Sequence, residues 1–311
     1  MVHRVIGQEQ LGSGSGTRSV SSLETLSALI DWSPVMTLLA PVHASAKGEA
    51  AWPPLSMFQA LLLSVWYDLS EVKLAEALDD RASFRRFCGF CGTEPVPERT
   101  AFVRFRRALI GAGLDRAVFE AVTAQLKAKA VTVKTGTIVD ATIIASASED
   151  DTQARWVKHK TKPAVHGFKA HVGADAGAAL VEEVSVTPAN VHDGRAGFAA
   201  LPQNPGEVFA DSAYRGQVFA EAVRARGGTP RIVAIAMWGR DEQETLGRLK
   251  AHNRPIHQVR GRIEKIFGTW KRSYGLRRMR WRGIAKANAQ VLLTAIACNL
   301  KRSLTITAKP A

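Results

Sequence analysis

The chain has 311 residues, 46% of them hydrophobic and 23% charged, which is typical of a globular protein with one large domain or two ordinary ones. Its 42 Lys and Arg outnumber 28 Asp and Glu, and a formal net charge of +14 is typical of proteins that bind nucleic acid. No apolar stretch approaches the roughly 18 residues that span a bilayer, and no signal peptide is evident. We therefore predict a cytoplasmic protein without membrane contact.

The amino-terminal part is predicted to be a leader followed by helices. Residues 1–20 are expected to be flexible, because their Gly/Ser run lacks the Gly-Lys-Ser/Thr end of a phosphate-binding loop. Residues 21–130 are expected to form an all-helical domain, in which Ser21 and Glu24 make a capping box for the first helix. Further helices are predicted to begin near residues 53, 69, 99 and 115.

Two features of this helical region carry alternative interpretations. The helix predicted at 99–109 is basic, and Arg104 and Arg107 are placed either to contact phosphates or on a solvated face. Cys88 and Cys91 form a Cys-x-x-Cys pair with no second pair to close a zinc site. We interpret these two cysteines as small buried side chains.

The pattern changes near residue 131. Short β-branched or alternating runs predict strands at 137–144, 167–174, 180–187 and 207–211, with a helix at 217–226 and a strand-like run at 231–237. A final helix is predicted at 283–300. Strands followed by helices favour a mixed sheet with covering helices, so the fold class is α+β.

Residues 248–282 contain twelve basic residues and a single acid, Glu264. A lone carboxylate weakens a phosphate-binding helix unless it has another task, such as holding a metal ion; the alternative is an ion pair with Arg260, worth about 0.3–0.5 kcal/mol. A helical wheel puts four polar residues on one stripe, namely His257, Arg260, Glu264 and Lys271. The adjacent apolar stripe contains Ile256, Val259, Ile263, Phe267 and Trp270.

Two aspartates stand where strands place functional groups. Asp140 interrupts the apolar run Ile138–Ile144, where a buried charge is costly unless it is paired or liganded. Asp211 ends the strand-like segment 207–210 and begins a turn, and ligand-binding residues favour such strand ends. Alone, either Asp is equally typical of a turn or helix cap.

Together these residues resemble a known family. Arg260, Glu264 and Lys271 have the spacing Arg-x₃-Glu-x₆-Lys of the DDE transposases of bacterial insertion sequences, and more narrowly of insertion-sequence family five within the family four/five group. His257 stands where that signature has Tyr. The segments around Asp140 and Asp211 resemble the family's two aspartate motifs, and the resemblance covers residues 50–302. The segments His166–His171, Asn190–Asp193 and Asn299–Arg302 also resemble family segments.

The resemblance implies a ribonuclease H-like catalytic domain at 131–311, with a mixed five-stranded sheet and flanking helices, and a DNA-binding or dimerisation role for 21–130. Asp140, Asp211 and Glu264 are then the catalytic carboxylates that hold two Mg²⁺ ions, with Mn²⁺ as a substitute. Such an enzyme cleaves the ends of its element and transfers them into target DNA. The implied partners are double-stranded DNA, both terminal inverted repeats and target, and a second copy of the chain, in the nucleoid. The residues expected to contact DNA are His257, Arg260, Lys271, Arg262, Lys169, Arg215, Arg272, Arg104 and Arg107.

Two alternatives remain at this stage. One is a ribonuclease H-like nuclease without transposition, against which the basic helix and the helical domain argue. The other is a catalytically inactive DNA-binding descendant of a transposase, against which the presence of all three acids argues. Among the tryptophans, Trp238, Trp270 and Trp281 are candidates for stacking on an unpaired base, and for Trp270 a place in the core is favoured.

Overall fold

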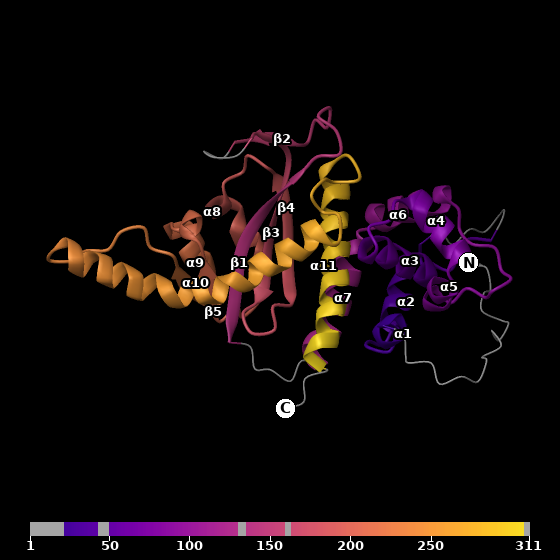
Figure 1. The fold of residues 1–311 in the computed structure, drawn as a ribbon, viewed down its shortest axis with the longest axis horizontal. Coiled ribbons are helices and arrows are strands. Elements are labelled where there is room, and N and C mark those ends of the chain that lie inside the picture. The colour runs from indigo at the N-terminus through magenta and orange to yellow at the C-terminus, as the bar shows by residue number, and fades with distance from the viewer. Residues whose placement is uncertain (1–21, 43–49, 130–134, 159–162, 308–311) are drawn as a thin grey trace. The chain divides into compact units, whose positions relative to one another are not determined.

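The computed structural model describes residues 22–42, 50–129, 135–158 and 163–307 (Figure 1). The predicted leader and the Ser21 cap lie outside these ranges. The chain divides into two compact units. The first is built from residues up to 130 and from 292 onward, and the second from residues 131–291, so the last helix contributes to both. None of the helices in the described ranges is both long and apolar enough to cross a membrane.

The first unit is helical, as predicted. Its helices are α1 (Ser22–Ser27), α2 (Ser33–Leu39), α3 (Pro54–Trp66), α4 (Glu71–Asp80), α5 (Ala82–Cys88), α6 (Arg99–Gly111), α7 (Leu114–Lys129) and the carboxyl-terminal part of α11 (Ile284–Thr307). Nearly every residue of α3 is buried, because α2, α4, α5 and α6 all pack on it. Its Trp66 indole donates a hydrogen bond to the carbonyl of Ala297 in α11 (2.9 Å). Cys88 and Cys91 are buried, which confirms their interpretation as small buried side chains.

The second unit contains a mixed sheet of six strands: β1 (Gly136–Ala145), β2 (Arg155–Val157), β3 (Val165–Asp175), β4 (Val181–Pro188), β5 (Glu207–Ala210) and β6 (Thr229–Ile232). β1 lies at the centre, antiparallel to β3 and parallel to β5, and β5 is parallel to β6. β2 and β4 pair with different segments of β3. The predicted mixed sheet is confirmed, with the short β2 as a sixth strand.

Different helices cover the two faces of the sheet (Figure 1). The remaining elements of this unit are α8 (Asp193–Ala196), the 3-10 turns η1 (Gly197–Ala200) and η2 (Ser212–Tyr214), α9 (Gln217–Ala225) and α10 (Glu242–Arg272). Val139 of β1 belongs to an apolar cluster with residues of η1, β5 and α9, whereas α10 packs on β1 and β5. Because successive side chains alternate between faces, Asp140 points to the face opposite Val139.

Five elements depart from the predictions. Helices α2 and α5 and strand β2 were not predicted, because they have too few residues to show a clear periodic pattern. The run predicted as a strand at 231–237 is paired only up to Ile232, and the strand begins earlier, at Thr229. Helix α1 is short and ends at Ser27. Short elements are specified by tertiary contacts more than by local periodicity.

Candidate active site

Asp140 and Asp211 are brought side by side by the register of two parallel strands. Gly136, Thr137 and Ile138 of β1 pair in order with residues 207–209 of β5. Continuing this register by two residues places Asp140 level with Asp211, one strand spacing away. β5 ends at Ala210, and Asp211 caps η2, its Oδ1 accepting a hydrogen bond from the amide of Ala213 (2.9 Å). The two aspartates predicted from separate motifs therefore meet at the carboxyl end of β5.

Arg260 of α10 joins the two carboxylates. Its Nη2 lies 2.9 Å from Asp140 Oδ2 and 3.8 Å from Asp211 Oδ2. The side chains of Arg260 and Asp140 are only 12% and 16% exposed, so water screens their contact little. Burial raises the pKa of Asp140, and the guanidinium of Arg260 and the Ala141 amide oppose that shift, while the charge of Asp211 adds to it. The two carboxylates thus already bind one cationic group, the guanidinium of Arg260.

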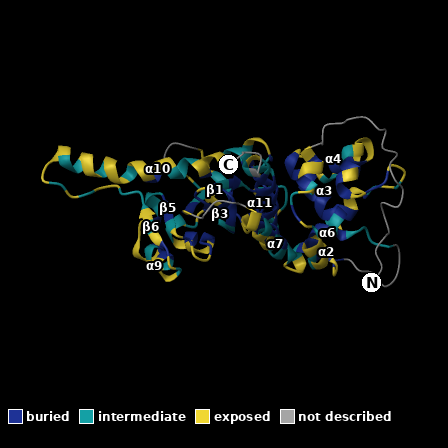
Figure 2. Cartoon of the chain, turned by 90° about the horizontal axis from the view of Figure 1, so that it is seen from below, coloured by how far each residue is buried: buried dark blue, intermediate teal, exposed yellow. Residues whose placement is uncertain are grey.

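Helix α10 positions Arg260 through its apolar stripe. Asp241 caps the helix by accepting a hydrogen bond from the amide of Glu244 (2.7 Å), and the helix continues through Pro255. Its buried residues begin at Ile256, and they are Ile256, Ile263, Ile266 and Trp270. The part before Ile256 has no buried residue (Figure 2). The core position predicted for Trp270 is confirmed by its 0% exposure.

Glu264 is not part of the carboxylate pair in this structure. It lies one turn after Arg260, is exposed, and lines an open cavity of about 540 Å³ together with Gly268, Lys271, Arg272 and Arg277. Within the described ranges, no three His, Cys, Asp or Glu side chains are grouped so that they could hold a metal ion. The structure thus brings two of the three predicted acids together and leaves the third in a cavity lined by cations.

Lys169, predicted to contact DNA, is buried behind the pair. Its ammonium lies 2.7 Å from Asp193 Oδ1 and donates to the carbonyl of Val191 (2.7 Å). His171, two residues along β3, is fully buried, with Nε2 3.0 Å from the hydroxyl of Thr187. Burial lowers the pKa of His171 to about 4, despite the opposing charge of Asp193. These groups form a buried polar layer, so the ammonium of Lys169 is directed into the fold.

The other residues predicted to contact DNA lie mostly on the surface. His257, Arg215 and Arg272 are exposed, as are Arg104 and Arg107 on α6. Arg262 is also exposed, although its guanidinium donates to the carbonyl of Ala176. Trp238, one of the stacking candidates, is 81% exposed in the segment that precedes α10.

Sequence reasoning assigned no role to Asp193 or Tyr214, and both border the site. Tyr214 is fully buried three residues after Asp211, and Asp193 pairs with Lys169. Both residues stand in segments whose resemblance to the family was recognised. The family resemblance of these segments could therefore have pointed to both residues. The ion pair between Lys169 and Asp193, however, can be recognised only in the folded structure.

Both halves of the chain match models of known protein families. Residues 132–300 match the model of a family described as a transposase DDE domain. Residues 16–108 match a second model, described as a transposase domain (DUF772). Among solved structures, the chain is similar to piggyBac transposase in a cryo-EM structure of its synaptic complex with hairpin DNA. The TM-score is 0.51 at 10% identity, covering 94% of this chain and 77% of that one. At this identity the likeness concerns the fold alone.

Proposed function

Because the chain belongs to the family of transposases with a DDE domain, we propose that it cuts DNA at the ends of a bacterial insertion sequence and transfers those ends into target DNA. The observation that carries the mechanism is the joint contact of Asp140 and Asp211 with one cation, Arg260. Transposases of the narrower insertion-sequence family five carry the same Arg-x₃-Glu-x₆-Lys spacing. We assign the chain to that group on this spacing, with His257 in the place of Tyr.

The carboxylate pair fits a divalent metal ion by its chemistry. Carboxylate oxygens are the ligands that Mg²⁺ prefers, with Mn²⁺ as a substitute. Two such ions activate an attacking oxygen and stabilise the leaving oxygen in phosphoryl transfer. Asp140 and Asp211 are held for this task by backbone pairing, and each accepts one backbone hydrogen bond on Oδ1. Their Oδ2 atoms both face Arg260, which marks the place where a metal ion is expected.

Glu264 is proposed as the third carboxylate of the loaded site. It stands one helical turn from Arg260, beside cations that attract DNA phosphate. Because its side chain is exposed, Glu264 can turn toward the pair when DNA and metal ions bind. Glu264 thus joins the site together with the substrate, in contrast to the preformed Asp140 and Asp211.

DNA binding is proposed for cations of both units. Lys271 and Arg272 line the cavity beside Glu264, and Arg104 and Arg107 lie on the surface of α6. Phosphate contacts of this kind position the duplex without reading its sequence. We do not extend the proposal to Lys169, whose ammonium is paired inside the fold. A homodimer is proposed because two ends of an element must be cut and joined in one event.

The test is excision of a marked element from a donor plasmid. Wild-type protein is compared with Asp211→Asn, in Mg²⁺ and in EDTA, and Asp150→Asn serves as the control because its side chain is 81% exposed. We expect metal-dependent excision by the wild type and the control, and none by Asp211→Asn, with DNA binding retained. Excision by Asp211→Asn would remove this residue from the site. Tight binding to the ends without excision by the wild type would favour the inactive descendant, and cleavage without joining would favour a nuclease.

A further inference from the structure

Trp156 of β2 is held in place and is nevertheless exposed. It pairs with His166 of β3 in the sheet, and the centroids of the two rings are 5.3 Å apart. His166 is fixed in turn, because its Nδ1 lies 2.8 Å from the hydroxyl of Ser146. Trp156 remains 55% exposed. A tryptophan that is positioned but not covered is typical of a surface that binds a partner, because its rigid ring loses little conformational freedom on binding.

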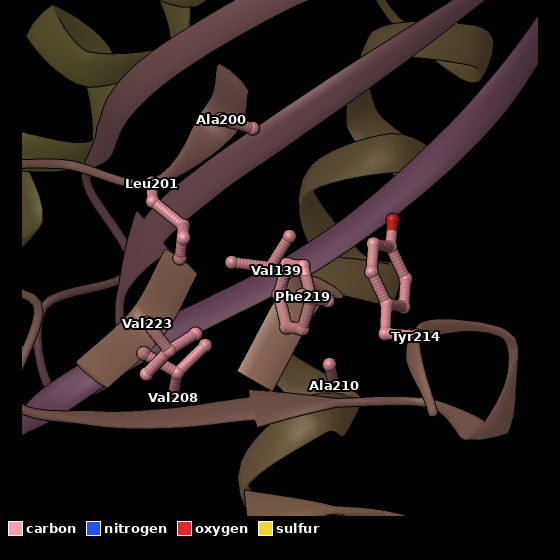
Figure 3. Packing of buried hydrophobic residues seen from close by; sticks show 8 residues of the cluster. All are labelled: Val139, Ala200, Leu201, Val208, Ala210, Tyr214, Phe219 and Val223. Atoms are coloured by element: carbon pink, nitrogen blue, oxygen red, sulfur yellow. The ribbon is translucent and has the colours of Figure 1, made fainter. Parts of the chain in front are cut away.

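Trp156 lies on the face of the sheet that carries Asp140. Val139 belongs to the apolar cluster of the other face (Figure 3), so every second residue from Asp140 to Ser146 points away from that cluster. The amide of Ser146 donates to the carbonyl of His166 (2.9 Å), which continues the register of β1 and β3 by one residue. His166 in turn pairs with Trp156. Because paired residues of neighbouring strands share a face, the indole ring and the Asp140 carboxylate are on the same side.

The segment after α10 connects the cavity beside Glu264 to this end of the sheet. Arg277 lines the cavity, and its carbonyl accepts a hydrogen bond from the amide of Ala145 at the end of β1 (3.1 Å). Arg278 donates from Nε to the carbonyl of Ser146 (3.1 Å). The segment brings exposed cations to the strands that hold Trp156. Together with those of α10 and β2, these cations are Arg155, Lys158, Arg272, Arg277 and Arg278.

The charge of this surface favours a polyanion. Two exposed acids, Glu149 and Asp150, lie in the adjoining loop, and Asp150 is already paired with Arg282 (3.4 Å). The exposed cations outnumber these acids, so the region around Trp156 attracts phosphate. A base and its phosphates offer both kinds of contact at once, because an aromatic ring packs on the base while cations hold the phosphates.

The distance from the carboxylate pair fits a contact within the same DNA segment. Ser146 lies six positions after Asp140, which is about 20 Å along a strand that rises about 3.3 Å per residue. Each base pair of B-DNA advances about 3.4 Å, so this distance corresponds to about six base pairs. A duplex whose cleaved phosphate lies at the pair therefore reaches Trp156 if it runs along the cations toward the end of β1.

We propose that Trp156 is a DNA-contacting residue whose indole ring packs against a base about six base pairs from the cleaved phosphate. The inference rests on the proposed function, which places that phosphate at Asp140 and Asp211. Phosphate contacts alone allow a duplex to slide along a basic surface. The contact of Trp156 with a base, supported from behind by His166, fixes how far the terminal DNA has advanced into the site.

The test is photocrosslinking with 5-iododeoxyuridine, placed singly at successive positions of a terminal duplex, because this base crosslinks to an aromatic side chain in direct contact. We expect the wild type to crosslink in a narrow group of positions about six base pairs from the cleaved phosphate. Mass spectrometry of the crosslinked peptide should identify Trp156, and this readout needs no variant. Trp156→Ala should lose the crosslink and bind the duplex about tenfold more weakly.

Two further variants sharpen the result. Trp156→Phe keeps an aromatic ring and should keep the crosslink, with a smaller loss of affinity than Trp156→Ala. Phe198→Ala is the matched control, since Phe198 is also exposed (43%) but belongs to η1, which packs on the other face of the sheet. It should change neither the crosslink nor the affinity. The slope of log affinity against log salt should stay the same in all three variants, because none removes a cation.

A crosslink that persists in Trp156→Ala, or a wild-type crosslink that maps to another residue at these positions, would overturn the proposal. Excision from the donor plasmid separates this failure from that of the proposed function. If the wild type excises the element but no position crosslinks through Trp156, only the role of Trp156 fails. If Trp156 crosslinks to terminal DNA but excision is absent, the contact stands and the proposed reaction fails.

Discussion

Asp140 lies on β1 and Asp211 directly follows β5, the parallel strand that pairs with β1, whereas Glu264 stands on the exposed side of a single helix. The first two are close together before any ligand arrives, and a buried guanidinium compensates their charge. Glu264 lines a cavity whose other charged residues, Lys271, Arg272 and Arg277, are all cations. In the proposed site, Asp140 and Asp211 are therefore the preformed part, and Glu264 is the part that substrate must complete.

The largest expected effect is the loss of strand cleavage in Glu264→Gln, and a comparison with Asp140→Asn distinguishes the two parts of the site. Glu264→Gln should lower strand cleavage about 100-fold or more, as expected for a lost metal ligand, yet leave the Mn²⁺ affinity of the DNA-free protein near the wild-type value. Asp140→Asn should lower both. Cleavage assays and Mn²⁺ titrations of the two variants check this. A clear loss of DNA-free Mn²⁺ binding in Glu264→Gln would mean that the third carboxylate is preformed after all.

The buried layer behind the pair should make stability depend on pH. The pKa of His171 is about 4 in the fold, against about 6.5 in an unfolded chain. The unfolded chain therefore binds more protons between these values, so the stability from neutral His171 is present above pH 6.5 and is lost as pH falls toward 4. We expect on the order of 2 kcal/mol to be lost between pH 7 and pH 5.

Urea unfolding at the two pH values measures that loss, and His171→Gln provides the comparison. Glutamine retains a donor for the Thr187 hydroxyl but does not titrate, so the variant should lack this part of the pH dependence. Equal pH dependence in the variant and the wild type would show that His171 is not the group responsible.

A smaller effect is expected when Arg260, which contacts both Asp140 and Asp211, is replaced. Arg260→Gln should raise the Mn²⁺ affinity of the DNA-free protein about tenfold, because a positive charge near the carboxylates no longer competes with the metal ion. Arg254→Gln, on an exposed part of the same helix, makes the same change in net charge and should have less than about a twofold effect. Similar Mn²⁺ affinities in the two variants would show that Arg260 acts only through the net charge of the protein.

The smallest effect concerns the cavity alone. Lys271→Ala should weaken binding to terminal DNA and lower the slope of log affinity against log salt by about one unit. Lys265→Ala is the control, since Lys265 is exposed on α10 but does not line the cavity. Fluorescence anisotropy at several salt concentrations measures both slopes. A slope that stays unchanged in Lys271→Ala would exclude a phosphate contact there.

Much of the fold could be predicted because its signals are local. The β-branched run at 137–144 predicted a strand, which is confirmed as β1. Of the predicted apolar stripe of α10, Ile256, Ile263 and Trp270 are buried, whereas Val259 and Phe267 are half-buried. The helices near residues 54, 71, 99 and 114 are also confirmed. The short elements α2, α5 and β2 were missed because so few residues show too few repeats for a pattern to be recognised.

The sequence by itself determined the candidates for the chemistry: three acids in motifs that resemble those of the family, and a helix rich in cations with a single Glu. Only the tertiary structure decided their partners. It joined Arg260 to Asp140 across 120 residues of chain, directed Lys169 inward to Asp193, and separated Glu264 from the pair. The physical reason is that composition and spacing specify the periodicity of one element, whereas a side chain's burial and charge partners depend on which elements pack against it.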